Sequence, residues 1–135
     1  MSRDADMFPI QCLRGFKDQL HLRGIDTVNG KTAYILMARI GDDLRERYYI
    51  DSSTNLLVRR TILTKSPIAW IPNQLDYFDY RQIDGVMVPF ETRSAYVNPR
   101  ENTIRRMTSI EQNGSVDEKL FLKPEMKPEK EDDKK

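Results

Sequence analysis

Two turn dipeptides constrain the fold of this chain more than any other feature. Asn29-Gly30 and Asp84-Gly85 each stand between two runs that are rich in β-branched and aromatic residues. Asn-Gly and Asp-Gly accept the positive φ angles of a two-residue hairpin loop, and the flanking runs are typical of strands. We therefore expect two β-hairpins that turn at these dipeptides.

Polar turn clusters divide the rest of the chain into similar short runs, and no helix-length periodic segment lies between these runs. The spacing predicts a mainly β fold in which each strand pairs with the next in an antiparallel meander. The seven predicted strands are 20–28, 31–40, 44–50, 56–65, 74–83, 86–97 and 103–112. Residues 66–73, which hold two prolines and the only Trp, are expected to form a loop.

The two-residue loops also predict how the strands of each hairpin pair. The expected opposite pairs are Val28 with Lys31, Ile25 with Tyr34, Leu22 with Met37, Ile83 with Val86 and Asp79 with Phe90. Neither face of either hairpin is then cleanly polar, whereas a solvated antiparallel face normally alternates to charged residues. We expect a sheet that is covered, at least partly, on both sides.

The two ends of the chain differ from the middle. Residues 1–19 form a lead-in with either a short helix or an extended path, and residues 20–122 form the antiparallel β-sheet domain. Residues 123–135 contain ten charged residues, five of each sign, and only one apolar residue. Such a segment buries too little surface to offset its ordering entropy. We expect a charged, disordered tail whose residues 125–135 can be deleted.

Composition excludes several classes of function. With 22 Lys and Arg against 21 Asp and Glu, the near-neutral balance argues against binding nucleic acid by bulk charge. No apolar run is long enough to span a membrane, and the first residues do not resemble a signal peptide. Cys12 and His21 are the only thiol and imidazole, so no metal site, haem-attachment motif or nucleophilic dyad is predicted. We expect no catalytic residues and no cofactor within this segment.

Aromatic residues are the more informative feature. Nine of the twelve lie between Tyr34 and Tyr96. One interpretation is ordinary sheet packing, and the other is an aromatic surface that binds an apolar ligand or an extended peptide. The candidate ligand-binding residues are Tyr34, Tyr48, Trp70, Phe78 and Tyr80. Trp70 lies in the predicted loop, which could fold over a ligand as a short lid.

Arginine outnumbers lysine in the predicted strands. Guanidinium groups suit bidentate contacts with phosphate or carboxylate, which leaves room for an anionic partner. The alternative is that these arginines form cross-strand pairs with Asp and Glu on a solvated face.

The order of turns and strand ends resembles the C-terminal half of bacterial lipoprotein-carrier-like domains, the fold of outer-membrane lipoprotein-sorting proteins. The matching pieces are VNGKTAYILMA, RYYIDSSTNLLVRR, LDYFDYRQIDGVMVPFETR and TIRRMTSIEQNGSVDEKLFLKP, within residues 20 to 124. The resemblance implies a curved, half-barrel-like sheet. Complete carriers are longer, with further N-terminal strands and lid helices. The chain is also similar to C-terminal modules of reaction-centre-type cytochrome c subunit-like proteins.

These resemblances imply a non-catalytic binding or accessory module of an exported bacterial protein, with a periplasmic or otherwise exported location. Its partner would be an apolar ligand, a lipoprotein-like protein or another domain of its parent chain. The alternative is an accessory or docking domain of a photosynthetic cytochrome c subunit-like protein. Because this segment has no CxxCH motif, the haem sites of such a parent would lie elsewhere.

Overall fold

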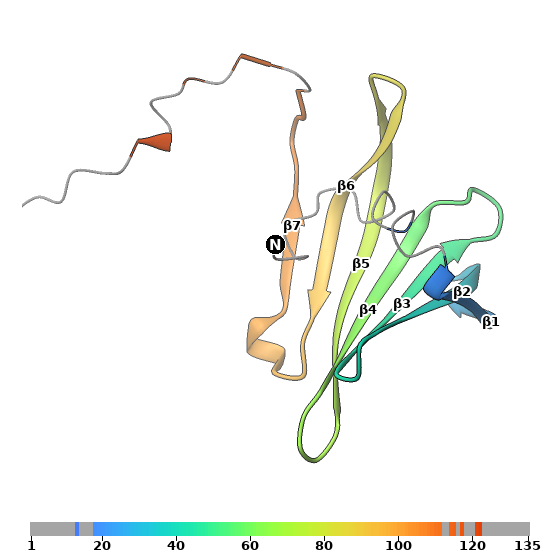
Figure 1. Cartoon of the computed structure of the whole chain (residues 1–135). Helices are drawn as coiled ribbons and strands as arrows, with labels where there is room; N and C mark the ends of the chain where they lie inside the picture. Colours follow the sequence, from blue (N-terminus) through green and yellow to red (C-terminus); the bar gives the residue numbers. More distant parts are fainter. Residues whose placement is uncertain (1–12, 14–17, 112–113, 116, 118–120, 123–135) are drawn as a thin grey trace, which may run out of the picture.

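Seven strands form one sheet, and each strand pairs in antiparallel fashion with the next along the chain (Figure 1). The computed structural model describes residues 13, 18–111, 114–115, 117 and 121–122. The strands are β1 (Leu20–Val28), β2 (Lys31–Ile40), β3 (Leu44–Asp51), β4 (Leu57–Lys65), β5 (Trp70–Ile83), β6 (Val86–Ala95) and β7 (Thr103–Arg106). A short 3₁₀ helix, η3 (Pro99–Glu101), joins β6 to β7. The predicted seven-stranded meander is confirmed.

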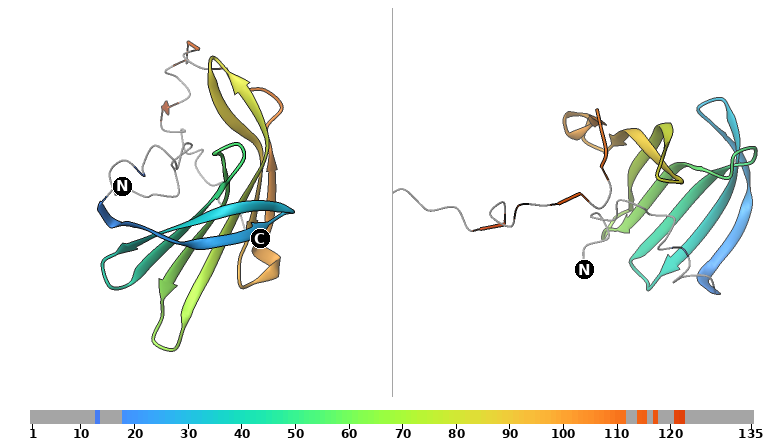
Figure 2. Two further views of the ribbon diagram at one scale, coloured as in Figure 1. Left: turned by 90° about the vertical axis from the view of Figure 1, so that its right-hand side faces the viewer. Right: turned by 90° about the horizontal axis from the view of Figure 1, so that it is seen from above.

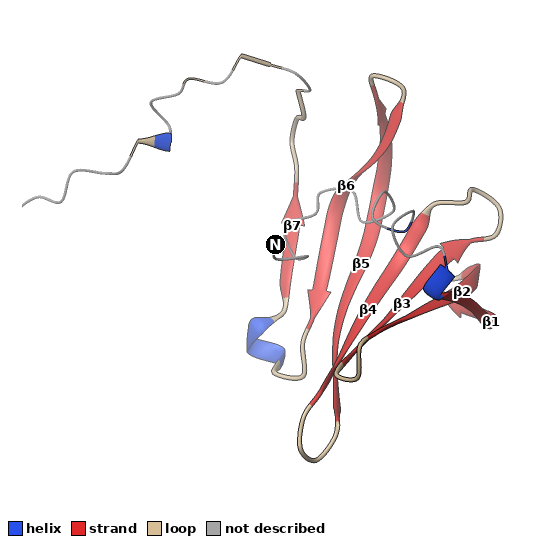
Figure 3. Cartoon of the chain, viewed as in Figure 1, coloured by secondary structure: helices blue, strands red, loops and turns tan. Residues whose placement is uncertain are grey.

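The sheet is open and strongly curved (Figure 2). Strands β1 and β7 are its two edges, because neither pairs with a second strand. Most of the described residues lie in strands, and few of them are helical (Figure 3). The expected half-barrel-like fold is therefore present.

Both predicted hairpin turns form as expected. Asn29 and Gly30 have φ angles of 51° and 77°, and Asp84 and Gly85 have 47° and 84°. Two successive positive φ values match the right-handed twist of the flanking strands. The closing pairs are Val28 with Lys31 and Ile83 with Val86.

One predicted pair in the first hairpin is wrong. Ile25 lies opposite Tyr34, but Leu22 lies opposite Leu36 instead of Met37. The cause is a β-bulge between Leu22 and Gly24, where Gly24 adopts a φ of 148° that a side chain disfavours. An extra residue turns the start of β1 over, so Leu22 moves to the opposite face from the one predicted.

The predicted loop over residues 66–73 is too long. Only residues 66–69 form the turn, and Trp70 pairs with Lys65 as the first residue of β5. Pro72 lies opposite Leu63 of β4, while pairing of β5 with β6 begins only at Gln74. One side of β5 is therefore a free edge at Pro72, where the missing N–H group leaves no ladder bond unmade.

The second hairpin keeps its predicted register across an irregular point. Phe78 pairs with Glu91 and Tyr80 with Pro89, which places Asp79 level with Phe90 as predicted. Asp79 itself has a φ of 52°. The Met107 N–H group donates to the Phe90 carbonyl, which therefore points away from β5, and the neighbouring Pro89 lies opposite Tyr80. Proline has no N–H group to donate there, which fits the interrupted ladder.

Two of the later strands are shorter than predicted. Strand β6 ends at Ala95 instead of residue 97, and β7 ends at Arg106 instead of residue 112. In the lead-in, the structure describes Leu13, which is helical, and residues 18–19. The predicted tail, residues 123–135, lies outside the described residues.

Side chains from five strands meet in one buried cluster. Its central members are Ala38, Tyr48, Leu57 and Tyr77. Leu20 of β1 and Tyr80 of β5 both pack against it, as does Leu13. The pairing of the five strands places these side chains on one face of the curved sheet. We call it the inner face and the opposite side the outer face.

The outer face carries a second, smaller cluster near the β1–β2 turn. Val28, Ala33, Tyr49 and Val58 are its buried members, and Ile35 packs against them. Both faces therefore bury side chains, as the mixed composition of the hairpins predicted.

Candidate functional site

Apolar side chains run without a break from the inner cluster to the β1 edge. Ile25 lies opposite Tyr34, and Tyr34 lies opposite Ile50, which packs against the cluster. Leu22 is linked in the same way through Leu36. At the edge the side chains become exposed, by 64% at Ile25, 66% at Leu22 and 41% at Tyr34. We call Leu22, Ile25 and Tyr34 the rim.

An ion pair lies inside the apolar inner face. Arg60 is only 4% exposed and Glu46 only 1%. The Arg60 Nη2 atom donates to both carboxylate oxygens of Glu46 at 3.2 Å, and Nε donates to Oε2 at 3.3 Å. The buried hydroxyl of Tyr48 also donates to Glu46. Glu46 is thus fixed by two different donors.

Burial and charge oppose each other at Arg60. Loss of solvent disfavours the charged guanidinium, but the Glu46 carboxylate more than offsets this and raises the pKa of Arg60. A charge this deeply buried is stable only when it is paired and hydrogen-bonded. The pair therefore holds β3 and β4 in register on the inner face.

Two tyrosines of β5, the buried Tyr77 and the half-buried Tyr80, line the same face. Burial raises the pKa of Tyr77 to about 12. The pKa of Tyr80 is raised by burial too, and its hydroxyl donates to the Leu57 carbonyl at 2.7 Å. Both phenols thus stay neutral at physiological pH. They give the inner face a polar element without a charge.

The outer face is ordered by ion pairs and by arginine stacking on rings. Arg59 forms a two-pronged pair with Asp76, with Nε–Oδ1 at 2.5 Å and Nη2–Oδ2 at 2.8 Å. The hydrogen bonds that Arg59 donates to Asp76 are the main reason that the pKa of Arg59 is raised. Arg45 stacks at 4.3 Å on the Trp70 ring, and Arg93 stacks at 4.5 Å on Phe78.

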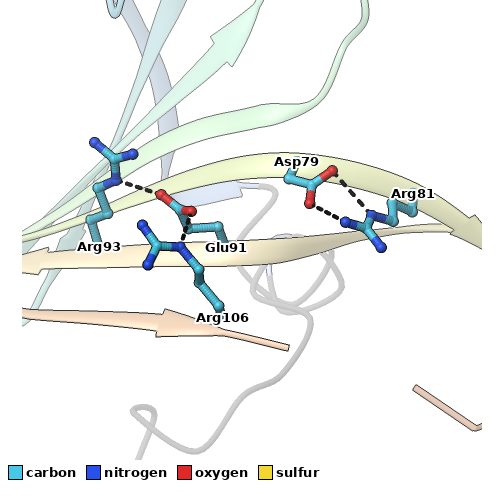
Figure 4. A network of polar contacts seen from close by, with 5 residues as sticks. All are labelled: Asp79, Arg81, Glu91, Arg93 and Arg106. Atoms are coloured by element: carbon cyan, nitrogen blue, oxygen red, sulfur yellow. Dashed lines mark hydrogen bonds and ion pairs between the residues drawn. The ribbon is translucent and has the colours of Figure 1, made fainter. Parts of the chain in front are cut away.

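A second carboxylate on this face is shared by two arginines (Figure 4). Arg93 Nε donates to Glu91 Oε1 at 2.6 Å, and Arg106 Nε donates to Oε2 at 2.7 Å. Arg106 and then Arg93 lower the pKa of Glu91 by these bonds. Farther along β5, Arg81 pairs with Asp79 at 2.6 Å and stacks at 4.3 Å on Phe90.

The structure divides the five predicted ligand-binding residues between the two faces. Tyr34 and Tyr48 lie on the inner face, Tyr34 at the exposed rim and Tyr48 buried at 2%. Tyr80 packs against the same inner cluster. Trp70 and Phe78 stand under Arg45 and Arg93 on the outer face. One ligand on one face cannot contact all five residues.

Sequence reasoning did not single out Glu46 or Arg60. A signal for Glu46 was present, because Leu44, Glu46, Tyr48 and Ile50 alternate along β3 and so share one face. An acidic residue in an otherwise apolar alternation predicts a buried partner. The rim was missed at Leu22 because the bulge that brings it to the inner face leaves no clear trace in the periodicity.

The composition argued against a metal site, against chemistry based on His or Cys, and against a membrane span. Among the described residues, no three His, Cys, Asp or Glu side chains gather closely enough to hold a metal ion. His21 is exposed on β1, and Cys12 lies outside the described residues. In the described part of the chain, no helix has the length and apolar character to cross a membrane.

Comparisons with known proteins show the fold. No family model matches the chain, and no curated protein matches it either. A crystal structure from Vibrio parahaemolyticus is similar, with a TM-score of 0.50 and 13% sequence identity. It is described as a candidate outer membrane lipoprotein-sorting protein domain. The match covers 70% of this chain and 44% of the solved one, so this chain spans less than half of that domain.

The curved sheet thus has a fold similar to that of the lipoprotein-sorting domain, as the resemblance implied. The second resemblance, to modules of cytochrome c subunits, receives no support from these comparisons.

Proposed function

We propose that this sheet is a non-catalytic binding module of an exported bacterial protein, and that its inner face accepts an apolar ligand or the apolar part of a lipoprotein-like partner. The exposed rim of Leu22, Ile25 and Tyr34, continuous with the buried inner cluster, carries this proposal. Exposed apolar surface that is continuous with a buried apolar cluster is typical of ligand or partner sites.

Of the five candidate residues, Tyr34 and Tyr80 are placed best to contact such a ligand. Tyr34 offers an exposed ring at the rim, and Tyr80 is half-buried beside the cluster. Tyr48 would contribute from below, since its ring is buried and its hydroxyl is bonded to Glu46. Apolar area removed from water there contributes about 25 cal/mol per Å² before association costs.

A titration with an apolar fluorophore tests the proposal, and the chain offers a matched pair of variants. Ile25 and Ile104 are both isoleucines on edge strands, exposed by 64% and 56%. Ile25 lies on the inner face, whereas Ile104 lies opposite Arg93 on the outer face. We expect I25T to weaken dye binding about fivefold, since about 1 kcal/mol of apolar contact is lost.

The I104T variant is expected to bind the dye as the wild type does. Trp70 lies on the outer face under Arg45, so its emission should stay unchanged while the dye signal rises. Absence of dye binding, or equal weakening by I25T and I104T, would contradict an inner-face site. The alternative role as a docking module of a cytochrome-like parent stays a prediction, and the comparisons give it no support.

A further inference from the structure

The outer face holds two ion-pair systems that differ in how fully their donors are used. In the Arg59–Asp76 pair both prongs of the guanidinium bind the carboxylate, and Gln74 Nε2 donates to the same two oxygens at 3.2 Å. The side chains are only 23% and 12% exposed. We call this pair closed, because one positive charge faces one negative charge and the Arg59 and Gln74 donors that face the carboxylate are all hydrogen-bonded to it.

The Arg93–Glu91–Arg106 group is open by comparison. Each arginine gives only its Nε–H group to Glu91, and within the described residues neither Nη group of either side chain has a hydrogen-bond partner. The two arginines are 50% and 67% exposed, while the carboxylate between them is 14% exposed. Two guanidinium groups thus present their outer edges to solvent while one partly buried carboxylate anchors both.

The local charge balance leaves the group positive. Arg93 and Arg106 stand against Glu91, two positive charges against one negative charge. Asp76 lies directly opposite Arg93, but its oxygens already accept from Arg59 and Gln74. The Phe78 ring beneath Arg93 further restrains that guanidinium. Preorganised, partly unsatisfied guanidinium pairs suit oxyanions with several acceptor atoms.

We propose that Arg93 and Arg106 form a binding site for a phosphate group on the outer face, held in shape by Glu91 and Phe78. The phosphate oxygens would accept from the outer Nη groups, while Glu91 keeps the two side chains together from below. This site is separate from the inner face and stands whether or not the inner face binds an apolar ligand.

Titration with inorganic phosphate tests the site directly. The Nε–H signals of Arg93 and Arg106 are followed by NMR at constant ionic strength, with chloride as the reference anion. We expect saturable shifts of both signals in the wild type. The R106Q variant should bind phosphate about tenfold more weakly, because it loses one charge-assisted donor set.

R105Q is the matched control, since Arg105 is the preceding residue of the exposed edge strand and points to the inner face opposite Thr92. It should bind phosphate as the wild type does. The proposal is overturned if the wild type shows no saturable shift, or if R106Q and R105Q weaken binding equally.

Vesicles distinguish the two sources of a phosphate group. Phosphatidylglycerol vesicles are compared with pure phosphatidylcholine vesicles by co-sedimentation. Binding that needs phosphatidylglycerol and is lost in R106Q but kept in R105Q assigns the site to a lipid headgroup. Binding of inorganic phosphate without vesicle binding assigns it to a soluble phosphate compound. Vesicle binding that R106Q leaves intact, without phosphate shifts, overturns the proposal.

Discussion

Arg59 and Arg60 are neighbours in β4, yet they meet two very different environments. Arg60 points to the inner face, where its side chain is 5% exposed and its partner Glu46 1%. Arg59 points to the outer face, where the pair with Asp76 is 23% and 12% exposed. An arginine–carboxylate pair thus lies once inside an apolar cluster and once on the outer face, where part of it is exposed to solvent. Burial, more than geometry, should decide what each pair contributes.

Breaking the inner pair should have the largest effect. R60M leaves the Glu46 carboxylate buried without its cation, and loss of one partner of a buried pair costs about 3–5 kcal/mol. Folded domains are stable by only about 5–15 kcal/mol, so R60M should lower the urea midpoint strongly. The double variant E46Q/R60M removes both charges and keeps an acceptor for the Tyr48 hydroxyl. It should regain much of the loss, and equal loss in both variants would contradict the argument.

Alkaline pH should test the inner face through Tyr77. Its pKa is raised from 10.0 to about 12 by burial, so folding favours the neutral phenol. This stabilisation is complete below pH 10 and is lost as the pH rises toward 12, by about 2–3 kcal/mol in all. Stability measured by urea unfolding should therefore fall over this range.

The Y77F variant should reduce that decline only in part, because burial also raises the pKa of Tyr80, which this variant keeps. Y34F, which removes the hydroxyl group of a tyrosine that is 41% exposed, is the matched control. An unchanged decline in Y77F would show that Tyr77 is not its source.

Features that depend on residues close together in the sequence could be predicted, whereas features that depend on contacts between distant residues could not. Turns at Asn29-Gly30 and Asp84-Gly85 are local chemistry, and both were predicted correctly together with the meander that follows from them. The pairing of Leu22 failed because a single extra residue in β1 reverses its face. Nothing near Leu22 in the sequence distinguishes a bulging Gly24 from a glycine in a regular strand.

The candidate site shows the same division. Tyr34 was predicted opposite Ile25 from the Asn29-Gly30 turn, which is local chemistry, and the structure has this pair. Trp70 was expected in a lid over the ligand, but Pro72 is tolerated at the free edge of β5, so the strand starts earlier and Trp70 lies on the outer face. The pairing of Glu46 with Arg60 and of Arg59 with Asp76 depends on the register of neighbouring strands, which no two-residue turn sets here and which a bulge shifts between Tyr49 and Ile50.

Breaking the outer pair should cost less than breaking the inner one. D76N keeps the shape of the side chain but removes the charge that Arg59 faces, and a partly exposed pair is worth about 1 kcal/mol. Because solvent reaches this pair, 1 M NaCl should reduce the loss, whereas the loss in R60M should not change with salt. Measurement of both variants by urea unfolding at low and high salt makes the comparison. Equal salt sensitivity would show that burial is not what separates the two pairs.

The smallest expected effect concerns the bulge that brings Leu22 to the inner face. Gly24 has a φ of 148°, and a Cβ built there meets nothing within 4 Å, so G24A costs backbone strain and no steric clash. We expect a loss of about 1 kcal/mol or less by urea unfolding. If strain removes the bulge, Leu22 returns to the pairing with Met37 and leaves the rim, so apolar dye binding should weaken as well.

A deletion of Arg23 provides the control, because it removes the extra residue but keeps Leu22 opposite Leu36. In that background G24A should be harmless to both stability and dye binding, and a loss of the same size there would show that the bulge does not set the rim.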